Sequence, residues 1–331
     1  MKRKIPLLCL LLLLWMGVIS CTSQPVSTPA LEAVTVQLKW VHQAQFAGFY
    51  VAVEKGYYAD ENVDVTLHPG GVGVDIMDEV LSGRADFGLI GPEHIIQNRS
   101  AGDPVKAIAT TYRNNPFVLV TMPDSGIESP YDFPGHSANL GGIDGLIQFN
   151  AMMAKLNLNT DDIQIVPYSY DLGSFYQGDV DITPAFAAGS LMGITKEHTD
   201  VNLIWPVDYG IHFYSDTLFA TDDFITENPD LVLRFLRATL KGHRDAIENP
   251  EDALRFSMLY AEDADPDVQA QMIAASIPLI YTGHDDIGWM RAEVWENMLA
   301  ILQEQDLLSG QVDMDDVYTM QFLEQIYGGE L

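Results

Sequence analysis

The spacing of hydrophobic and polar positions predicts alternating strands and helices through the first 120 residues. Residues 34–39 (VTVQLK) alternate apolar and polar side chains, as a half-buried strand does, and residues 46–55 have helical spacing that Gly56 closes. Further strands are expected at 63–67, 87–90, 105–111 and 117–122, with helices at 74–81 and 93–99. This order of strands and helices predicts an α/β fold with a mostly parallel sheet that carries helices on both faces.

The pattern restarts after Asp124. Strands are expected at 137–140, 163–166, 180–183, 201–205 and 217–220, with a long helix at 142–156, a short one at 172–176 and mostly helix from Asn228 onward. Two α/β units with a return to the first are typical of a bilobed binding protein. We expect residues 34–120 and 218–331 in lobe 1, residues 121–217 in lobe 2, and crossings near 118–122 and 217–220.

The N-terminus has the pattern of an export signal. Lys2, Arg3 and Lys4 precede an apolar stretch at 5–19 that is short for a membrane span. The stretch ends in Ser20-Cys21, which resembles the lipobox of bacterial lipoproteins, in which the cysteine receives a diacylglycerol. We therefore expect a signal peptide at 1–20, lipidation of Cys21 and a flexible Ser/Thr/Pro-rich tether at 21–33. Location on the extracytoplasmic face of the cell membrane follows; an ordinary secretory signal or an uncleaved anchor is the alternative.

Composition excludes several classes of function. The chain of 331 residues carries 47 acidic and 17 basic side chains, for a formal net charge of −30. Such an excess repels phosphate backbones, so we expect no nucleic-acid partner. The two cysteines, Cys9 and Cys21, cannot form a disulfide framework or a thiolate metal site, and we expect neither a metal nor a cofactor.

Several stretches resemble one known family. They are residues 37–52 (QLKWVHQAQFAGFYVA), 54–58 (EKGYY), 63–65 (VDV), 83–88 (GRADFG), 129–135 (SPYDFPG) and 228–232 (NPDLV). Together they look like the signature of the NMT1/THI5-like substrate-binding proteins of ABC transporters. The resemblance implies a type II periplasmic-binding-protein fold with two lobes, a central cleft and two hinge crossings. It also implies a transporter permease as partner, and we expect the chain to act as a monomer.

Ligand-binding residues are expected on loops that follow strands and at helix starts, because these positions line the cleft of such folds. Aromatic rings there can stack on a flat ligand, while imidazole, amide and carboxylate groups can hydrogen-bond to its edge. Core packing of Trp40 and a helix-capping role for Glu93 are the competing interpretations. The candidates are Trp40, His42, Gln45, Gly91, Glu93, Tyr112, Gly142, Asp144, Tyr168 and Tyr170.

The chemistry of these loops favours an uncharged, flat heterocycle, because they carry almost no Arg or Lys that could balance an anion. Two branches of the family qualify, namely binders of riboflavin and binders of the formylaminopyrimidine precursor of thiamine. The pyrimidine binders usually carry an Asn-Glu pair where this chain has Gly189-Ser190. Loss of that carboxylate and the extra room favour riboflavin, with the pyrimidine precursor as the alternative.

An enzyme on the same fold is the other alternative. The eukaryotic pyrimidine synthase resembles this chain in its opening motif, but it acts with pyridoxal phosphate on a lysine, a histidine donor and a Cys-rich iron site. No cysteine other than Cys21 would remain here after signal cleavage. We therefore expect no catalytic residues and a protein that captures its ligand without chemistry.

Overall fold

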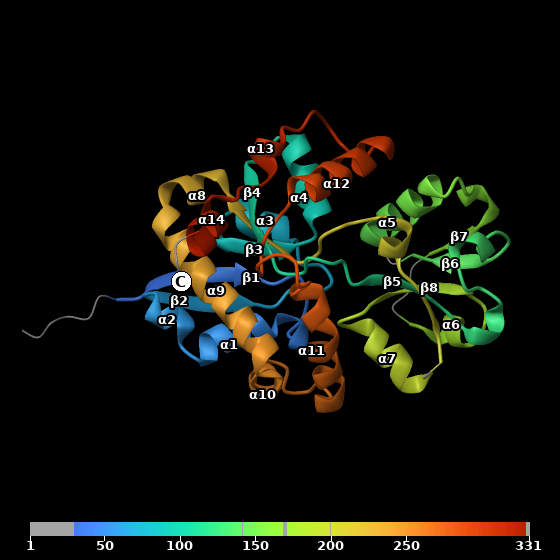
Figure 1. Cartoon of the computed structure of the whole chain (residues 1–331), viewed down its shortest axis with the longest axis horizontal. Coiled ribbons are helices and arrows are strands. Elements are labelled where there is room, and N and C mark those ends of the chain that lie inside the picture. The colour runs from blue at the N-terminus through green and yellow to red at the C-terminus, as the bar shows by residue number, and fades with distance from the viewer. Residues whose placement is uncertain (1–29, 141, 168–170, 199, 329–331) are drawn as a thin grey trace, which may run out of the picture. The chain divides into compact units, whose positions relative to one another are not determined.

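Two five-stranded sheets, each with its own helices, make up the structure, which is a computed structural model (Figure 1). It describes residues 30–140, 142–167, 171–198 and 200–328. The expected signal peptide, Cys21 and most of the tether lie outside the described residues. The two sheets correspond to the two expected lobes, which we call the first and the second lobe.

The first sheet has the strand order β2-β1-β3-β10-β4. β1 pairs in parallel with β2 and β3, whereas β10 runs antiparallel to both of its neighbours, so the sheet is mixed rather than wholly parallel. Alternation in β1 buries Val34 and Val36, as the pattern predicts. The strands are β1 (Glu32–Gln37), β2 (Val63–His68), β3 (Phe87–Ile90), β4 (Val105–Thr110) and β10 (Thr217–Thr221).

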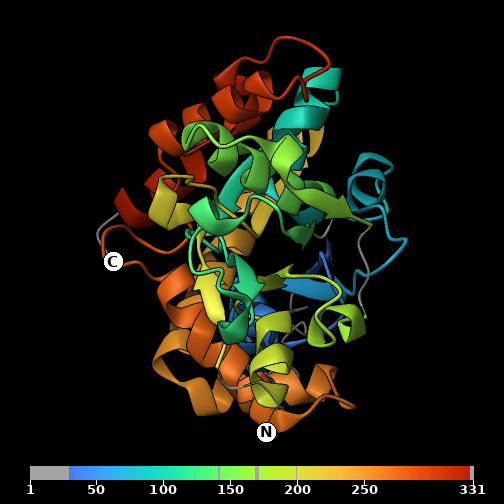
Figure 2. The same ribbon diagram turned by 90° about the vertical axis from the view of Figure 1, so that its right-hand side faces the viewer.

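Helices from both ends of the chain surround this sheet. The C-terminal ones form two groups in the view of Figure 2, with α10 and α11 in orange at the bottom and the red helices α12 to α14 at the top. The helices are α1 (Ala47–Glu54), α2 (Tyr57–Asp60), α3 (Ile76–Leu81), α4 (Pro92–Ala101), α8 (Asp222–Glu227), α9 (Pro229–Glu248), α10 (Pro250–Tyr260), α11 (Pro266–Ile280), α12 (Ala292–Glu304), α13 (Met314–Val317) and α14 (Gln321–Gly328).

The second sheet has the order β7-β6-β8-β5-β9 and is also mixed. β6 pairs in parallel with β7 and β8, and β5 runs antiparallel to β8 and β9. Its strands and helices are β5 (Phe117–Thr121), β6 (Ser137–Asn139), β7 (Gln164–Val166), β8 (Ile182–Phe186), β9 (Asn202–Ile204), α5 (Gly142–Lys155), α6 (Gly173–Tyr176) and α7 (Ser190–Glu197).

The structure corrects the expected positions of the crossings between the lobes. Residues 118–122 and 217–220 fall almost entirely within β5 and β10, which are strands of the second and first sheet respectively. The chain instead passes between the sheets at 111–116 and again at 205–216. The lobe boundary expected after residue 120 therefore falls inside β5. This strand is buried throughout, and its hydrophobic sequence does not indicate on which side of it the hinge lies.

A close helix contact holds the core of the first lobe together. α1 crosses α9 where Gly48 faces the ring of His243 and where Gly242 faces the carbonyl oxygen of Gly48. A Cβ atom at either glycine would overlap its neighbour, so only glycine permits this approach. α9 buries one of its faces, which includes Phe235 and Leu236.

Candidate functional site

One wall of the interlobe cleft is the segment that follows β1. Lys39, Trp40, Gln43 and Gln45 line a cavity of ≈ 290 Å³ that also contains residues of the second lobe. The backbone N–H of Gly70, which follows β2, donates to the Trp40 carbonyl oxygen at 2.9 Å. The pairing of β1 with β2 therefore fixes the loop that carries these four side chains.

Asp216, on the second crossing, binds side chains of this wall through its carboxylate. Its carboxylate is buried and accepts from Lys39 Nζ at 2.9 Å and from Gln45 Nε2 at 2.5 Å. Gln43 Nε2 in turn donates to Gln45 Oε1 at 2.6 Å. Both ends of the Gln45 amide are therefore engaged within the protein, while the charge of Lys39 is compensated where it faces the cleft.

Glu93 adds a buried carboxylate to the same wall. It stands in the first turn of α4, whose N-cap is Gly91, and only 3% of the residue is exposed. The partial positive charge at a helix N-terminus stabilises a carboxylate there. The side chain folds back over Gly91, where a Cβ atom would overlap its carboxylate. The charges of Lys39, Asp216 and Glu93 sum to −1, which disfavours an anionic ligand.

The opposite wall comes from the second lobe and is largely apolar. It consists of Phe117, Gly145, Gln148, Pro184, Ala185, Phe186, Gly189 and Ser190. Phe186, at the end of β8, lies 5.0 Å from Lys39 Nζ to the ring centroid, so a cation–π contact joins the two walls. Trp40, Phe117 and Phe186 thus give the cleft three aromatic side chains from two lobes. Such a site can hold a flat, uncharged ring by stacking and a few hydrogen bonds.

The structure brings together three of the expected side chains. Trp40, Gln45 and Glu93 line the cleft, and Gly91 lies directly beneath Glu93. Gln45 faces Asp216 rather than presenting its whole amide to a ligand, because two side chains of the protein already hold it.

Two other expected residues lie behind the cleft wall. His42 packs against the stacked rings of Tyr50 and Tyr260, and its Nδ1 lies 3.0 Å from Tyr50 Oη. Burial lowers the pKa of His42, so the imidazole is neutral at pH 7. Tyr112 is fully buried, with its hydroxyl 2.7 Å from Ser276 Oγ, and burial raises its pKa. Its ring supports Phe186 from behind, at 6.4 Å between centroids.

The remaining expected residues are only partly described. Gly142 begins α5, as predicted, and Gly145 and Gln148 of the same helix line the cleft. The side chain of Asp144 lies outside what the structure describes, and so do Tyr168 and Tyr170. Their role as ligand contacts stays a prediction.

Several lining residues were not predicted from the sequence. Lys39 and Gln43 belong to the loop already singled out for Trp40, so proximity to that motif could have found them. Asn115, Phe117, Ser215 and the supporting Asp216 lie on or beside the two crossings. Their positions depend on how the crossings meet the first loop, and no local pattern indicates that.

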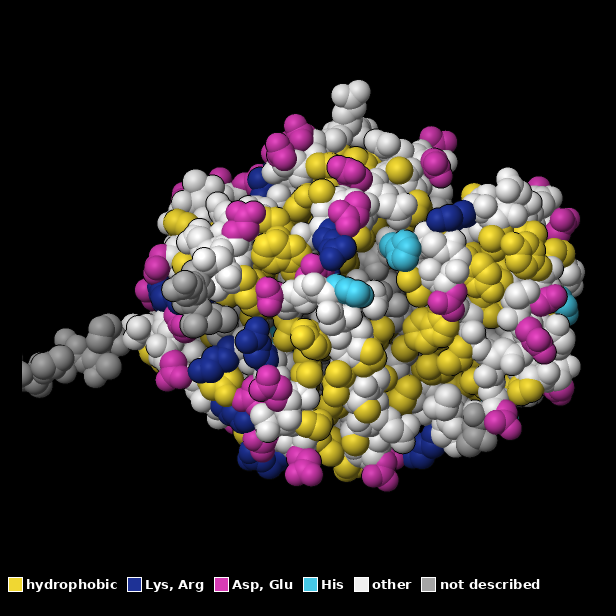
Figure 3. Space-filling view, in the orientation of Figure 1, with side chains coloured by type: hydrophobic (Ala, Val, Ile, Leu, Met, Phe, Trp, Pro, Cys, Tyr) yellow, Lys and Arg dark blue, Asp and Glu magenta, His cyan; other side chains and the backbone are white. Residues whose placement is uncertain are grey.

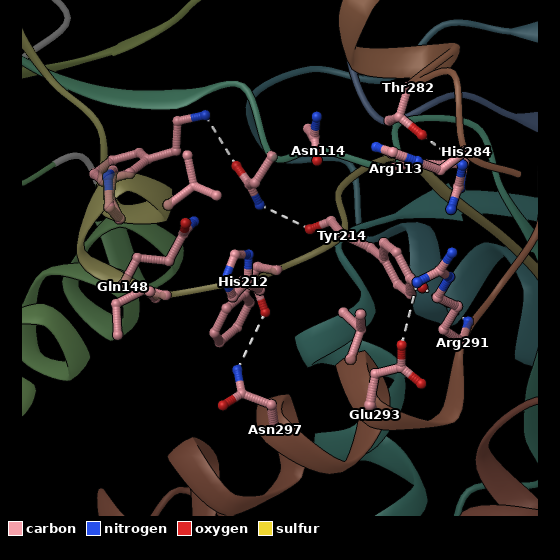
Figure 4. A pocket seen from close by; sticks show the side chains of 18 of the residues that line it. Arg113, Asn114, Gln148, His212, Tyr214, Thr282, His284, Arg291, Glu293 and Asn297 are labelled. Carbon is pink, nitrogen blue, oxygen red and sulfur yellow. Dashed lines mark hydrogen bonds and ion pairs between the residues drawn. The ribbon is translucent and has the colours of Figure 1, made fainter.

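A second, larger cavity of ≈ 750 Å³ lies along the two crossings, and we call it the hinge-side cavity (Figure 4). Three of its lining residues, Asn115, Phe117 and Gln148, also line the interlobe cleft. Its other walls come from 206–214 on the second crossing and from the chain between α11 and α12 with the start of α12. The two cavities therefore share a wall.

The described part of the chain lacks two features. In the part of the chain that the structure describes, no three His, Cys, Asp or Glu side chains are grouped so that they could hold a metal ion. Among the same residues, no helix is long and apolar enough to cross a membrane.

Comparison with known proteins gives two kinds of relative over most of the chain, namely binding proteins and synthases. The riboflavin-binding protein RibY of Chloroflexus aurantiacus is 24% identical over 316 residues, covering 90% of this chain and 88% of the relative. A formylaminopyrimidine-binding protein of Halalkalibacterium halodurans is 25% identical over 320 residues, covering 93% and 96%. Other relatives carry the name of a pyrimidine phosphate synthase.

Solved structures match the fold. A putative periplasmic sulfonate-binding protein, SsuA, of Methylobacillus flagellatus superposes with a TM-score of 0.71 at 18% identity, covering 91% of this chain and 95% of that one. This similarity confirms the periplasmic-binding-protein fold with two mixed α/β sheets. The family model described as "NMT1/THI5 like" matches residues 43–253, which is more than half of the chain. The protein therefore belongs to the NMT1/THI5-like family.

Proposed function

We propose that this protein is the substrate-binding component of an ABC importer and that it captures riboflavin in the interlobe cleft. Its relatives include a riboflavin-binding protein of nearly the same length, and its fold is that of transporter binding proteins. Ligand held between two lobes favours the closed state, since only that state contacts it on both faces. A permease then recognises the closed, loaded form.

The observation that carries this proposal is the composition of the cleft. Trp40, Phe117 and Phe186 surround a space whose single lysine is paired with Asp216. Stacking of a flat heterocycle on an aromatic side chain contributes about 1–3 kcal/mol. Capture at micromolar concentration requires about 8 kcal/mol, which stacking and several buried hydrogen bonds together can supply.

A pyrimidine precursor is the second candidate, and Glu93 is the observation in its favour. A buried carboxylate can accept from the amino group of an aminopyrimidine, although it can equally accept from the ring imide N–H of a flavin. Gly189 and Ser190 do line the cleft, at the place where the pyrimidine-binding branch carries its Asn-Glu pair. Without that second carboxylate, and with the room that two small residues leave, riboflavin ranks first.

A sulfonate is disfavoured in spite of the structural similarity to SsuA. An anion needs uncompensated positive charge, whereas the single lysine that lines this cleft is paired with Asp216. Catalysis of the pyrimidine synthase type is disfavoured by the sequence, because Cys9 and Cys21 are its two cysteines and cannot supply a Cys-rich iron site. Capture without chemistry accounts for the residues that are present.

The location follows from the N-terminal sequence. We propose that Cys21 carries the lipid anchor and that the Ser/Thr/Pro-rich tether connects this anchor to the folded protein. The protein would then work on the extracytoplasmic face of the cell membrane, as a monomer. Mass spectrometry of the protein from a membrane fraction tests this part. A diacylated N-terminal cysteine is expected, and a mature N-terminus elsewhere contradicts it.

Isothermal titration calorimetry of the mature protein with three ligands tests the ligand proposal. We expect one-to-one binding of riboflavin at micromolar concentration or tighter, weaker binding of formylaminopyrimidine, and no heat from an alkanesulfonate. Tighter binding of formylaminopyrimidine would reverse the ranking of the two candidates. Binding of the sulfonate alone would contradict the interpretation of the cleft.

A further inference from the structure

The hinge-side cavity differs in chemistry from the interlobe cleft beside it. Both cavities are lined by three aromatic side chains, but the hinge-side cavity adds five charged side chains and the neutral polar groups of Asn, Gln, Thr and His residues. Figure 4 shows Gln148 and His212 on one side of the cavity and Thr282 and His284 on the other. Amide, imidazole and hydroxyl groups of this kind hydrogen-bond to hydroxylated ligands.

Four of the five charged side chains of this cavity are engaged with one another, and the fifth, Lys155, donates to the carbonyl oxygen of Gly210 at 2.8 Å. Arg113 and Arg291 both bind Asp285, with Arg291 Nε and Nη2 at 2.7 and 2.9 Å from its two oxygens. Arg113 also donates to Thr282 Oγ1 at 2.7 Å, and Arg291 pairs with Glu293 at 3.4 Å. The two arginines and two carboxylates thus bind one another, and the cavity adds neutral hydrogen-bonding groups beside them.

Asn115, Phe117 and Gln148 form the wall that the two cavities share. Asn115 lines both, and it joins the two crossings because its Nδ2 donates to Tyr214 O at 2.7 Å while its Oδ1 accepts from Phe117 N at 2.9 Å. Gln148, from α5, also faces both cavities although only 3% of it is exposed. A ligand that extends past these residues would place one part in each cavity.

We propose that the hinge-side cavity is a second compartment of the binding site, which takes the polyhydroxylated chain of the ligand. This inference rests on the proposed capture of riboflavin, whose flat ring carries a hydroxylated ribityl chain. The cleft alone, at ≈ 290 Å³, falls just below the range of about 300–1,000 Å³ for ligand pockets. A ring in the cleft therefore leaves its polar chain to the adjoining cavity, where His212 and Asn297 offer partners.

Comparison of riboflavin with lumiflavin, which has a methyl group in place of the ribityl chain, tests the compartment. Two hydrogen bonds from the chain are expected to make riboflavin bind at least about tenfold more tightly to the wild-type protein. Equal affinities would overturn the compartment and leave the proposed function standing. Binding of neither flavin would overturn the proposed function, and the compartment with it.

A variant that fills the cavity locates the chain. Val294 lines the hinge-side cavity from the start of α12, and Val294→Trp would occupy part of that space. Riboflavin affinity should fall at least about tenfold while lumiflavin affinity stays unchanged, which also shows that the variant is folded. His212→Ala should act in the same direction, and Leu259→Trp, at a position 56% exposed on α10, serves as the control. Equal losses for both flavins, or no loss for either, would overturn the proposal.

Discussion

Trp40 is the residue on which the proposed capture depends most. It is half-buried, it packs against the core of the first lobe, and it also faces the cleft. Trp40→Ala should weaken riboflavin binding about tenfold to a hundredfold, since stacking on an aromatic ring contributes about 1–3 kcal/mol. Trp205→Ala is the matched control, because Trp205 packs against the core of the second lobe. A calorimetric titration in which both variants bind like the wild type would remove Trp40 from the site.

Asp216 should affect stability as well as binding. Asp216→Ala leaves Lys39 and Gln45 without their shared buried partner, which should lower the free energy of unfolding by about 3 kcal/mol. Asp78→Ala is the control, because its ion pair with Arg84 is exposed and should contribute less than about 1 kcal/mol. Urea unfolding measures both changes. Equal effects of the two substitutions would show that Asp216 does not organise the wall as described.

The sequence reveals a site residue only when that residue lies close to a recognisable local motif. Trp40 and Glu93 follow strand ends, so the pattern of strands placed them at the cleft. Asp216 precedes β10 and meets Lys39 only because the chain returns to the first sheet in antiparallel orientation. His42 lies beside Trp40 in the sequence, but its side chain points into an aromatic cluster instead of the cleft.

The contact between α1 and α9 tests how tightly the first lobe is packed. Gly242→Ala would place a Cβ atom against the backbone oxygen of Gly48 and should destabilise the protein by about 1–3 kcal/mol. Gly193→Ala, in α7 with open space around it, should instead stabilise by up to about 1 kcal/mol because alanine favours helix. Thermal unfolding distinguishes the two. A stabilising effect of Gly242→Ala would contradict the observed approach of the helices.

The same contact gives stability a dependence on pH. His243 is buried against Gly48, with Nδ1 2.9 Å from Thr239 O, and burial lowers its pKa from 6.5 to about 4. The unfolded chain binds this proton more readily, so the contribution of His243 is intact above pH 6.5 and is lost as the pH falls toward 4. The loss is on the order of 3 kcal/mol.

Comparison with His243→Phe isolates this residue from the carboxylates. The free energy of unfolding should fall more steeply between pH 6.5 and pH 4 for the wild type than for His243→Phe. Urea unfolding at several pH values measures the difference between the two proteins. Parallel pH profiles would show that His243 binds its proton equally well in the folded and unfolded states, which contradicts a pKa lowered by burial.

Periodicity predicted most elements to within a few residues but did not locate the crossings. Strands such as β1 alternate clearly because one face is buried and the other is not. β5 is buried throughout, and its sequence does not reveal which sheet it joins. Sheet membership depends on pairing between segments far apart in the chain, which sequence pattern alone does not determine.

The acidity of the whole molecule belongs to its surface. Within the described residues, Glu93 and Asp216 are the buried acidic side chains, and both lie at the cleft. Acidic groups are spread over the face seen in Figure 3 rather than gathered in one place. The net charge of −30 therefore describes the surface of the molecule and not its binding site.

Contacts between the lobes connect the site to the whole molecule. Lys196 of α7 pairs with Asp265 at the start of α11 at 2.5 Å, and Gln305 Nε2 donates to Ile147 O of α5 at 3.0 Å. Ligand in the cleft would add aromatic contacts to the same two lobes. Capture of the ligand therefore depends on both walls at once.

Fluorescence titration of riboflavin with the purified mature protein tests that claim most directly. Flavin emission should be quenched to a one-to-one endpoint, because the ring stacks on aromatic side chains of the cleft, and Trp40→Ala should restore most of the emission at the same protein concentration. Unchanged emission at saturating protein, together with binding heat from formylaminopyrimidine, would contradict riboflavin as the ligand.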